Sequence, residues 1–214
     1  MNAPNAVARA ERAALADLLL EVGPTAPTLC GGWDARDLAA HIVLRERRPD
    51  AAGGILLGVL KTRMERVQAA LAGQPWEQLV ATLREGPPSW SPVRMPAVDA
   101  QVNTIEFFVH HEDVRRGGAD WTPRALDEAT VETLWKHAAT TGKFLARACP
   151  VGVLLAPGDG PAAGSIVRVR AGIPEVTLVG PVGEIVLSLF GRVTQGLEIQ
   201  GPASARDAFL AYPR

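Results

Sequence analysis

Apolar residues recur every three to four positions through most of residues 1–148. Between Val7 and Val22 they fall at positions 7, 10, 14, 18 and 22, which is the period of an amphipathic helix. The same period predicts further helices at residues 34–48, 55–71, 76–84, 97–116 and 123–147. Gly and Pro mark the connections between them, so we expect residues 1–148 to form an up-and-down helical bundle.

The pattern changes to a period of two after Pro150. Segments rich in Val, Ile and Leu are separated by Gly, Pro and Asp, which predicts strands at residues 151–156, 165–171 and 175–180. A helix is expected at 181–194, a last strand at 197–200 and a terminal helix at 203–211. The predicted fold class is therefore mainly α with α+β: a helical domain over 1–148, then a small α+β domain over 149–214.

Composition and charge argue against several classes of partner. The chain has 214 residues, 47% of them apolar, and a formal net charge of −1. Basic and acidic residues are nearly equal in number, so neither nucleic acid nor a membrane surface is an expected partner. The N-terminus has no apolar segment of signal-peptide length and no apolar run suits a bilayer, which predicts a cytoplasmic protein. Cys30 and Cys149 are then interpreted as buried free thiols.

The stretch Asn103–Arg116 carries the strongest chemical signal. Glu106 and His110 are four residues apart, so in a helix both side chains leave the same face. A carboxylate and an imidazole in this arrangement can bind one metal ion if another segment supplies a third ligand. His41, in the helix predicted at 34–48, is the best upstream donor. Two histidines and one glutamate leave coordination positions open, as in catalytic zinc sites.

Each of these three residues also has a purely structural interpretation. His41 follows Leu38 and precedes Ile42 on an apolar helix face, where a histidine is often a core residue bonded to a neighbour. A buried glutamate and a buried histidine are costly without partners, so Glu106 and His110 could instead pair with each other or with other polar groups.

Asp113 lies one turn beyond His110 on the same side of the predicted helix, and its carboxylate is expected to bond a ligand histidine and so fix the orientation of the ring. Alternatively, Asp113 could belong to a solvated helix end or pair with Arg115 or Arg116. The arginines at positions 45, 47 and 48 are expected to form the solvated end of the helix that carries His41.

Three stretches together resemble the mycothiol-dependent maleylpyruvate isomerase family, within the wider group of DinB-like metal-binding bundles. They are GWDARDLAAHI at 32–42, EFFVHHEDVRR at 106–116 and GPVGEIVLSLFGR at 180–192. The chain is most similar to a subgroup described only as metal-binding, with no assigned reaction. The resemblance implies a DinB-like four-helix bundle followed by a sterol-carrier-like α+β domain. It also places the metal ligands of the family on His41, Glu106 and His110.

The resemblance further implies a low-molecular-weight thiol, mycothiol, as cosubstrate and a small-molecule electrophile as substrate. A divalent cation lowers the pKa of a bound thiol or water, so a thiolate can exist at neutral pH. In an isomerase the thiolate adds to a double bond and leaves again after rotation, whereas in a transferase it stays attached. Zn²⁺ suits the ligand set best, although Ni²⁺, Fe²⁺ or Mn²⁺ could take the same ligands.

Three further residues are candidates for contact with the substrate. Arg192 lies on an otherwise apolar predicted helix, and its guanidinium could bind a substrate carboxylate in a catalytic role; a salt bridge with Glu184 or another acid is the alternative. Trp33 and Trp90 could line a substrate pocket, or each could be a core residue.

Competing hypotheses belong to other classes of protein. The chain could be a metal- or small-ligand-binding protein without catalysis, or a bundle whose His and Glu residues only hydrogen-bond. Neither a phosphate-binding glycine loop nor a nucleophile elbow occurs in the sequence. We expect a monomer or a homodimer.

Overall fold

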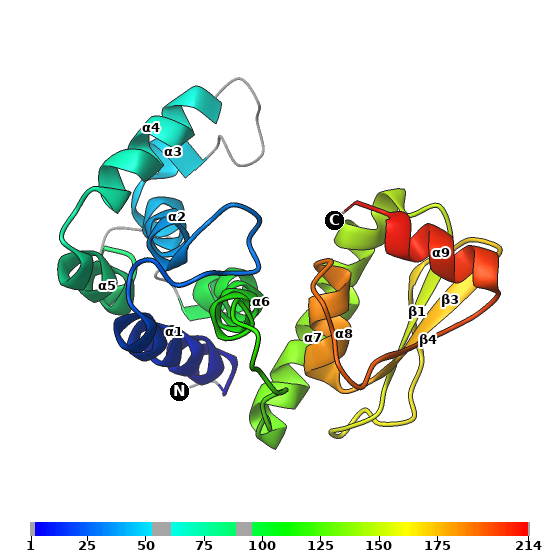
Figure 1. Ribbon diagram of the computed structural model, residues 1–214. Coiled ribbons are helices and arrows are strands. Elements are labelled where there is room, and N and C mark those ends of the chain that lie inside the picture. Colours follow the sequence, from blue (N-terminus) through cyan, green and yellow to red (C-terminus); the bar gives the residue numbers. More distant parts are fainter. Residues whose placement is uncertain (1–2, 53–60, 89–95, 214) are drawn as a thin grey trace. The chain divides into compact units, whose positions relative to one another are not determined.

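The computed structural model describes residues 3–52, 61–88 and 96–213. The chain divides into two compact units, Met1–Trp121 and Thr122–Arg214, and each is described by itself (Figure 1). Helices dominate, and a small sheet lies in the second unit. The predicted fold class, mainly α with α+β, is therefore confirmed. None of the helices in the described ranges is both long enough and apolar enough to cross a bilayer.

The first unit is helical throughout its described elements. α1 packs along α6, while α2 lies against α4 and α5. Its core is rich in fully buried leucines, among them Leu15, Leu38 and Leu79. The elements are α1 (Ala3–Val22), α2 (Ala35–Arg47), α3 (Pro49–Ala52), α4 (Lys61–Ala72), α5 (Trp76–Glu85) and α6 (Pro96–Arg115).

A side-chain cap explains where α2 begins. The Asp34 carboxylate accepts a hydrogen bond from the Asp37 backbone N–H at 3.0 Å and caps α2, which is the position predicted for the start of this helix. The helix expected at 55–71 is seen from Lys61 onward, and its first residues lie outside the described ranges.

The second unit contains three α-helices and a four-stranded sheet, in which the strands lie in the order β2-β1-β3-β4. β1 pairs antiparallel with β2 and parallel with β3, and β3 pairs antiparallel with β4. Its elements are α7 (Glu128–Leu145), a 3₁₀ turn (Ala146–Ala148), β1 (Gly152–Pro157), β2 (Val167–Arg170), β3 (Glu175–Gly180), α8 (Val182–Leu189), β4 (Glu198–Gln200) and α9 (Ala203–Ala211).

Two helix boundaries in this unit differ from the prediction. α7 begins at Glu128 rather than near residue 123, because the Asp127 carboxylate accepts the Thr130 backbone N–H at 2.7 Å and caps the helix there. α8 ends at Leu189, and Gly191 follows with a φ of 71°, which favours glycine. Arg192 therefore lies after the helix and not within it.

α7 packs on α8 and on β2. The helix that precedes residue 148 therefore shares a compact unit with the strands that follow it. The domain boundary predicted between residues 148 and 149 from the change of period stays a prediction.

Candidate metal centre

Glu106 and His110 lie one turn apart on α6, as their spacing predicts. The Glu106 Oε2 atom is 3.4 Å from His110 Nε2. The His110 ring is buried, whereas the Glu106 side chain keeps 33% of its surface exposed. One edge of the His110 ring therefore faces a carboxylate that solvent can reach.

His41 on α2 lies beside this pair. The rings of His41 and His110 are 5.6 Å apart between centroids and meet edge to face, and the Trp33 ring lies 4.9 Å from His41. His41 Nδ1 is buried, and it has no hydrogen-bond partner among the residues that the structure describes. Trp33 thus adjoins His41, while Trp90 lies outside the described residues.

The other edge of the His110 ring faces Asp113. Asp113 is fully buried, and its Oδ2 atom is 3.1 Å from His110 Nδ1. A carboxylate bonded to one ring nitrogen fixes the orientation and the tautomer of an imidazole, which leaves the other nitrogen available as a ligand. The two arginines at the end of this helix form ion pairs with the neighbouring Glu112. Glu112 lies 3.1 Å from Arg115 and 2.6 Å from Arg116.

Cys30 also lies at the edge of the His110 ring that faces Asp113, and the sequence pattern did not predict this position. Its Sγ atom donates to Asp113 Oδ2 at 3.0 Å and lies 3.9 Å from His110 Nδ1. The Cys30 turn is fixed to α6 by a backbone hydrogen bond from Leu29 N to Asp113 O at 3.0 Å. Gly117 allows this close approach, because a Cβ there would lie 1.9 Å from the Pro27 carbonyl oxygen.

Cys30, His110 and Asp113 are the set of possible ligands that the described part of the chain brings within reach of one metal ion. One ligand atom from each lies within 4.8 Å of the others. This set uses Nδ1 of His110, whereas the predicted set of His41, Glu106 and His110 would use Nε2. The described residues therefore bring a ligand set together at the Nδ1 edge, and the set at the Nε2 edge stays a prediction.

The position of Arg45 differs from the prediction. It does not belong to a solvated helix end: its side chain is only 15% exposed, and its Nη1 atom lies 3.4 Å from Glu106 Oε2. Its Nη2 atom donates to Asn103 Oδ1 at 2.7 Å, and Asn103 Nδ2 donates to Glu46 Oε1 at 3.1 Å. Glu46 in turn forms a bidentate pair with Arg12. We call Arg12, Glu46, Asn103, Arg45 and Glu106 the polar row.

The electrostatic environment differs between the three predicted ligands. Burial, reinforced by the nearby charges of His110 and Arg45, lowers the pKa of His41 to about 4, so this ring is neutral at pH 7. Burial works in the opposite direction on Glu106, but His110 and Arg45 outweigh it and hold its pKa at about 2. Burial disfavours the charged form of His110, yet Asp113, Cys30 and Glu106 raise the pKa of this ring well above its usual value.

Arg192, the predicted catalytic residue, lies in the second unit. It lines a cavity of about 530 Å³ together with Ser188, Thr194 and Tyr212. Its Nη1 atom donates to the Phe190 carbonyl oxygen at 2.9 Å. A catalytic role for Arg192 stays a prediction.

Comparison with known proteins identifies the fold. The chain matches no protein-family model and no curated protein. It is similar to two crystal structures of the mycothiol-dependent maleylpyruvate isomerase, one of them a histidine-to-alanine mutant. The mutant aligns with a TM-score of 0.62 at 17% identity, and the other structure with 0.54 at 19%. Both alignments cover 94% of this chain and 93% of the isomerase.

The chain has the fold of this isomerase. The resemblance inferred from three short stretches of sequence is thereby confirmed for the architecture, over nearly the whole length of both chains.

Proposed function

We propose that the protein is a metal-dependent enzyme that uses a low-molecular-weight thiol, mycothiol, as cosubstrate. The proposed reaction is either isomerisation of the maleylpyruvate type or transfer of the thiol to a small electrophile. The isomerase fold supports this class of reaction. The proposed ligands are His41, Glu106 and His110, and Zn²⁺ is the preferred ion.

The observation that carries the proposal is the arrangement around the His110 ring. Asp113 contacts Nδ1, so Nε2 is the nitrogen directed toward Glu106. The buried Nδ1 atom of His41 lacks a partner within the described part of the chain, which suits a ligand atom better than a core residue. These features fit a divalent cation held by two imidazoles and a carboxylate.

The bound cation would supply Lewis acidity, which stabilises a thiolate at neutral pH. The residues proposed to hold the cation have protonation states and contacts that bear on this binding. His41 is neutral and can offer a lone pair, and Glu106 is ionised. Asp113 holds the His110 ring in place, and because the pKa of this ring is raised, His110 would release a proton when the ion binds. Trp33 contacts the His41 ring and limits its movement.

The test is elemental analysis of the purified protein and of the variants His41→Ala, Glu106→Ala and His110→Ala. The wild type should contain about one equivalent of transition metal, and each variant should lose most of it because two protein ligands hold the ion more weakly than three. His137→Ala, a histidine substitution in the second unit, is the matched control and should retain the metal.

Activity is then measured with mycothiol and either maleylpyruvate or a generic electrophile. Thiol-dependent turnover that disappears in His110→Ala together with the metal would support the proposal. Metal-free wild-type protein, even after supplementation, would refute it, as would unchanged metal in both His41→Ala and Glu106→Ala.

A second candidate is a metal- or small-ligand-binding protein without catalysis. Arg45 favours the small-ligand form of this alternative, because a guanidinium 3.4 Å from Glu106 Oε2 already balances the charge of the carboxylate that an ion would need. Metal binding without thiol-dependent turnover would select this alternative.

A further inference from the structure

Cys30, His110 and Asp113 form a small triangle of three metal-ligating atoms. Cys30 Sγ lies 3.0 Å from Asp113 Oδ2 and 3.9 Å from His110 Nδ1, and the last two atoms are 3.1 Å apart. Bonds of about 2.0–2.3 Å to a tetrahedral zinc ion separate its N, O and S ligand atoms by about 3.3–3.6 Å. Shifts of a few tenths of an ångström would therefore let all three atoms bind one ion. We call this triangle the Nδ1 site.

Backbone contacts hold the two parts of the Nδ1 site together. His110 and Asp113 lie three residues apart on α6, so one turn of helix sets their spacing. On the other side, Leu29 N donates to the Asp113 carbonyl oxygen at 3.0 Å, and Thr28 Oγ1 accepts the Cys30 backbone N–H at 3.1 Å. The thiol is thus presented to α6 by a turn whose backbone is fixed before any ion binds.

Burial and charge at the Nδ1 site suit a divalent cation. Asp113 and His110 are buried, whereas Cys30 is partly exposed, which leaves its turn open to solvent. A thiolate and a carboxylate together balance the two positive charges of the ion, and the imidazole adds a neutral ligand. The ion would displace the thiol proton that Cys30 now donates to Asp113, together with the proton between Asp113 and His110 Nδ1. Both protons pass to solvent.

The opposite edge of the His110 ring supports the tautomer that the Nδ1 site requires. When Nδ1 binds an ion, Nε2 carries the proton and needs an acceptor. Glu106 Oε2 lies 3.4 Å from Nε2 and can accept this hydrogen bond, and a carboxylate in that position orients a ligand histidine. Glu106 would then orient the ring, which is the role of Asp113 when the ion lies at Nε2.

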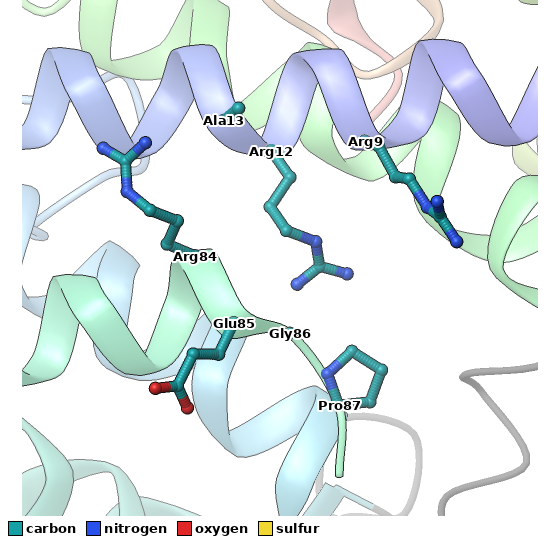
Figure 2. Close-up of a pocket in the computed structure, with 7 residues that line it drawn as sticks. All are labelled: Arg9, Arg12, Ala13, Arg84, Glu85, Gly86 and Pro87. Atoms are coloured by element: carbon teal, nitrogen blue, oxygen red, sulfur yellow. The ribbon is translucent and has the colours of Figure 1, made fainter. Parts of the chain in front are cut away.

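The polar row gives Glu106 a further reason to act as an acceptor. The row begins at Arg12, which Figure 2 shows extending from α1 toward Gly86 and Pro87, and it ends with Arg45 and Glu106. The Arg45 Nη1 atom lies 3.4 Å from Glu106 Oε2. Its positive charge opposes a cation beside Glu106 but leaves the carboxylate able to accept a hydrogen bond.

We propose that Cys30, His110 and Asp113 form a metal site of their own, for a thiophilic divalent cation such as Zn²⁺. The Nδ1 site shares the His110 ring with the set that includes His41 and Glu106. A neutral imidazole coordinates through one nitrogen and carries its proton on the other, so an ion at one edge of the ring excludes an ion at the other. The inference does not rest on the proposed function, because it holds whether or not His41 and Glu106 bind an ion.

The experiment is titration of the reduced, metal-free full chain with Co²⁺, which replaces Zn²⁺ and can be followed by absorption. A cobalt–thiolate bond adds a charge-transfer band in the near ultraviolet, which imidazole and carboxylate ligands do not give. We expect this band in the wild type and its loss in Cys30→Ser. Cys149→Ser is the matched control, since Cys149 is buried in the second unit, and it should keep the band. His41→Ala should also keep it, because His41 is not a ligand of the Nδ1 site.

A second measurement uses the wild type alone and so does not depend on the folding of a variant. Iodoacetamide alkylation followed by peptide mapping should label Cys30 in the metal-free protein, and saturating Zn²⁺ should suppress this labelling. The labelling of Cys149 serves as the internal reference and should not change with Zn²⁺. Circular dichroism establishes that the variants used in the Co²⁺ titration are folded.

The proposal is overturned if neither the wild type nor His41→Ala shows the charge-transfer band, if Cys30→Ser keeps the band, or if Cys149→Ser loses it. It is also overturned if Zn²⁺ leaves the alkylation of Cys30 unchanged. Co²⁺ that binds to the wild type without the band, and is lost in His41→Ala, would refute this inference and support the proposed function.

Discussion

The two units bury different kinds of side chain. Among the described residues, the first unit buries eight titratable side chains: Glu11, Arg12, Glu46, His110, His111, Glu112, Asp113 and Arg116. In the second unit, the titratable residues buried to the same degree are His137, Cys149 and Glu184. There the sheet and α8 enclose an apolar core that contains Val153, Leu178 and Ile185.

This difference indicates where positioned charge is concentrated. Burying a charge is unfavourable unless a partner compensates it. The first unit supplies such partners in pairs: His111 with Glu11 at 2.9 Å, Arg116 with Glu112 at 2.6 Å and His110 with Asp113 at 3.1 Å. An apolar core holds the second unit together, whereas the core of the first also holds ionisable groups in fixed positions. Because the first unit holds these ionisable groups in fixed positions, it is favoured as the location of the chemistry.

The largest expected effect is on stability, from Glu112→Ala in the first unit. Glu112 and Arg116 are each about 1% exposed, so removing the carboxylate takes a buried ion pair away from the Arg116 guanidinium. We expect a loss of about 3–5 kcal/mol in the free energy of unfolding, measured by urea denaturation. Glu112→Gln, which keeps the shape and one hydrogen-bond acceptor, should lose less.

The counterpart in the second unit is Leu178→Ala, on a fully buried strand position. It should cost about 2–5 kcal/mol through lost packing, whereas Leu178→Met keeps the volume and should cost less than about 1.5 kcal/mol. A loss below about 1 kcal/mol for Glu112→Ala would remove the contrast between the two units.

An intermediate effect is expected from Asp113→Asn on metal affinity. The substitution keeps the shape but weakens the contact that orients His110, so affinity should fall about 10- to 100-fold while the stoichiometry stays the same. Competition with a chromophoric chelator measures it. Glu184→Gln, a buried carboxylate of the second unit, should leave the affinity unchanged.

Cys30→Ser separates the two metal positions at the His110 ring. If the ion is held by His41, Glu106 and His110, this variant keeps its metal, because Cys30 Sγ faces His110 Nδ1 and the ion would lie at Nε2. Loss of metal in Cys30→Ser, with retention in Glu106→Ala, would instead place the ion between Cys30, His110 and Asp113.

The smallest effect concerns His137 in the second unit. Burial lowers its pKa below the usual value of 6.5, so the unfolded chain takes up a proton at a higher pH than the folded chain does. Its contribution to stability is fully present above pH 6.5 and is lost as pH falls through the folded pKa. Urea midpoints at pH 8 and pH 5 should therefore differ less in His137→Gln than in the wild type. An equal difference in both proteins would contradict this assignment.

Much of the fold follows from periodicity and capping. The apolar positions of the first helix, the Asp34 cap and the change of period after Pro150 are local signals, and the structure agrees with each. The misplaced boundaries of α7 and α8 depend on other local details: the Asp127 cap and the positive φ of Gly191. The apolar period continues past both positions, so the pattern alone does not indicate where α7 begins or where α8 ends.

The candidate centre was only partly predictable. The i, i+4 spacing of Glu106 and His110 is local, so one turn of helix was enough to pair them. Cys30 and Arg45 reach the centre through long-range packing, from a turn and from a neighbouring helix. A cysteine in a Gly-rich turn and an arginine in an arginine cluster carry no periodic signal that would place them there.

The polar row also limits how this sequence can change. Arg12 and Glu46 compensate each other at one end, Arg45 and Glu106 do so at the other, and Asn103 joins the two pairs through its amide. A single substitution at either pair removes one of two opposite charges, whereas an exchange of both partners preserves neutrality. Mutations along this row are therefore expected to be epistatic: variants that are tolerated together should be disfavoured one at a time.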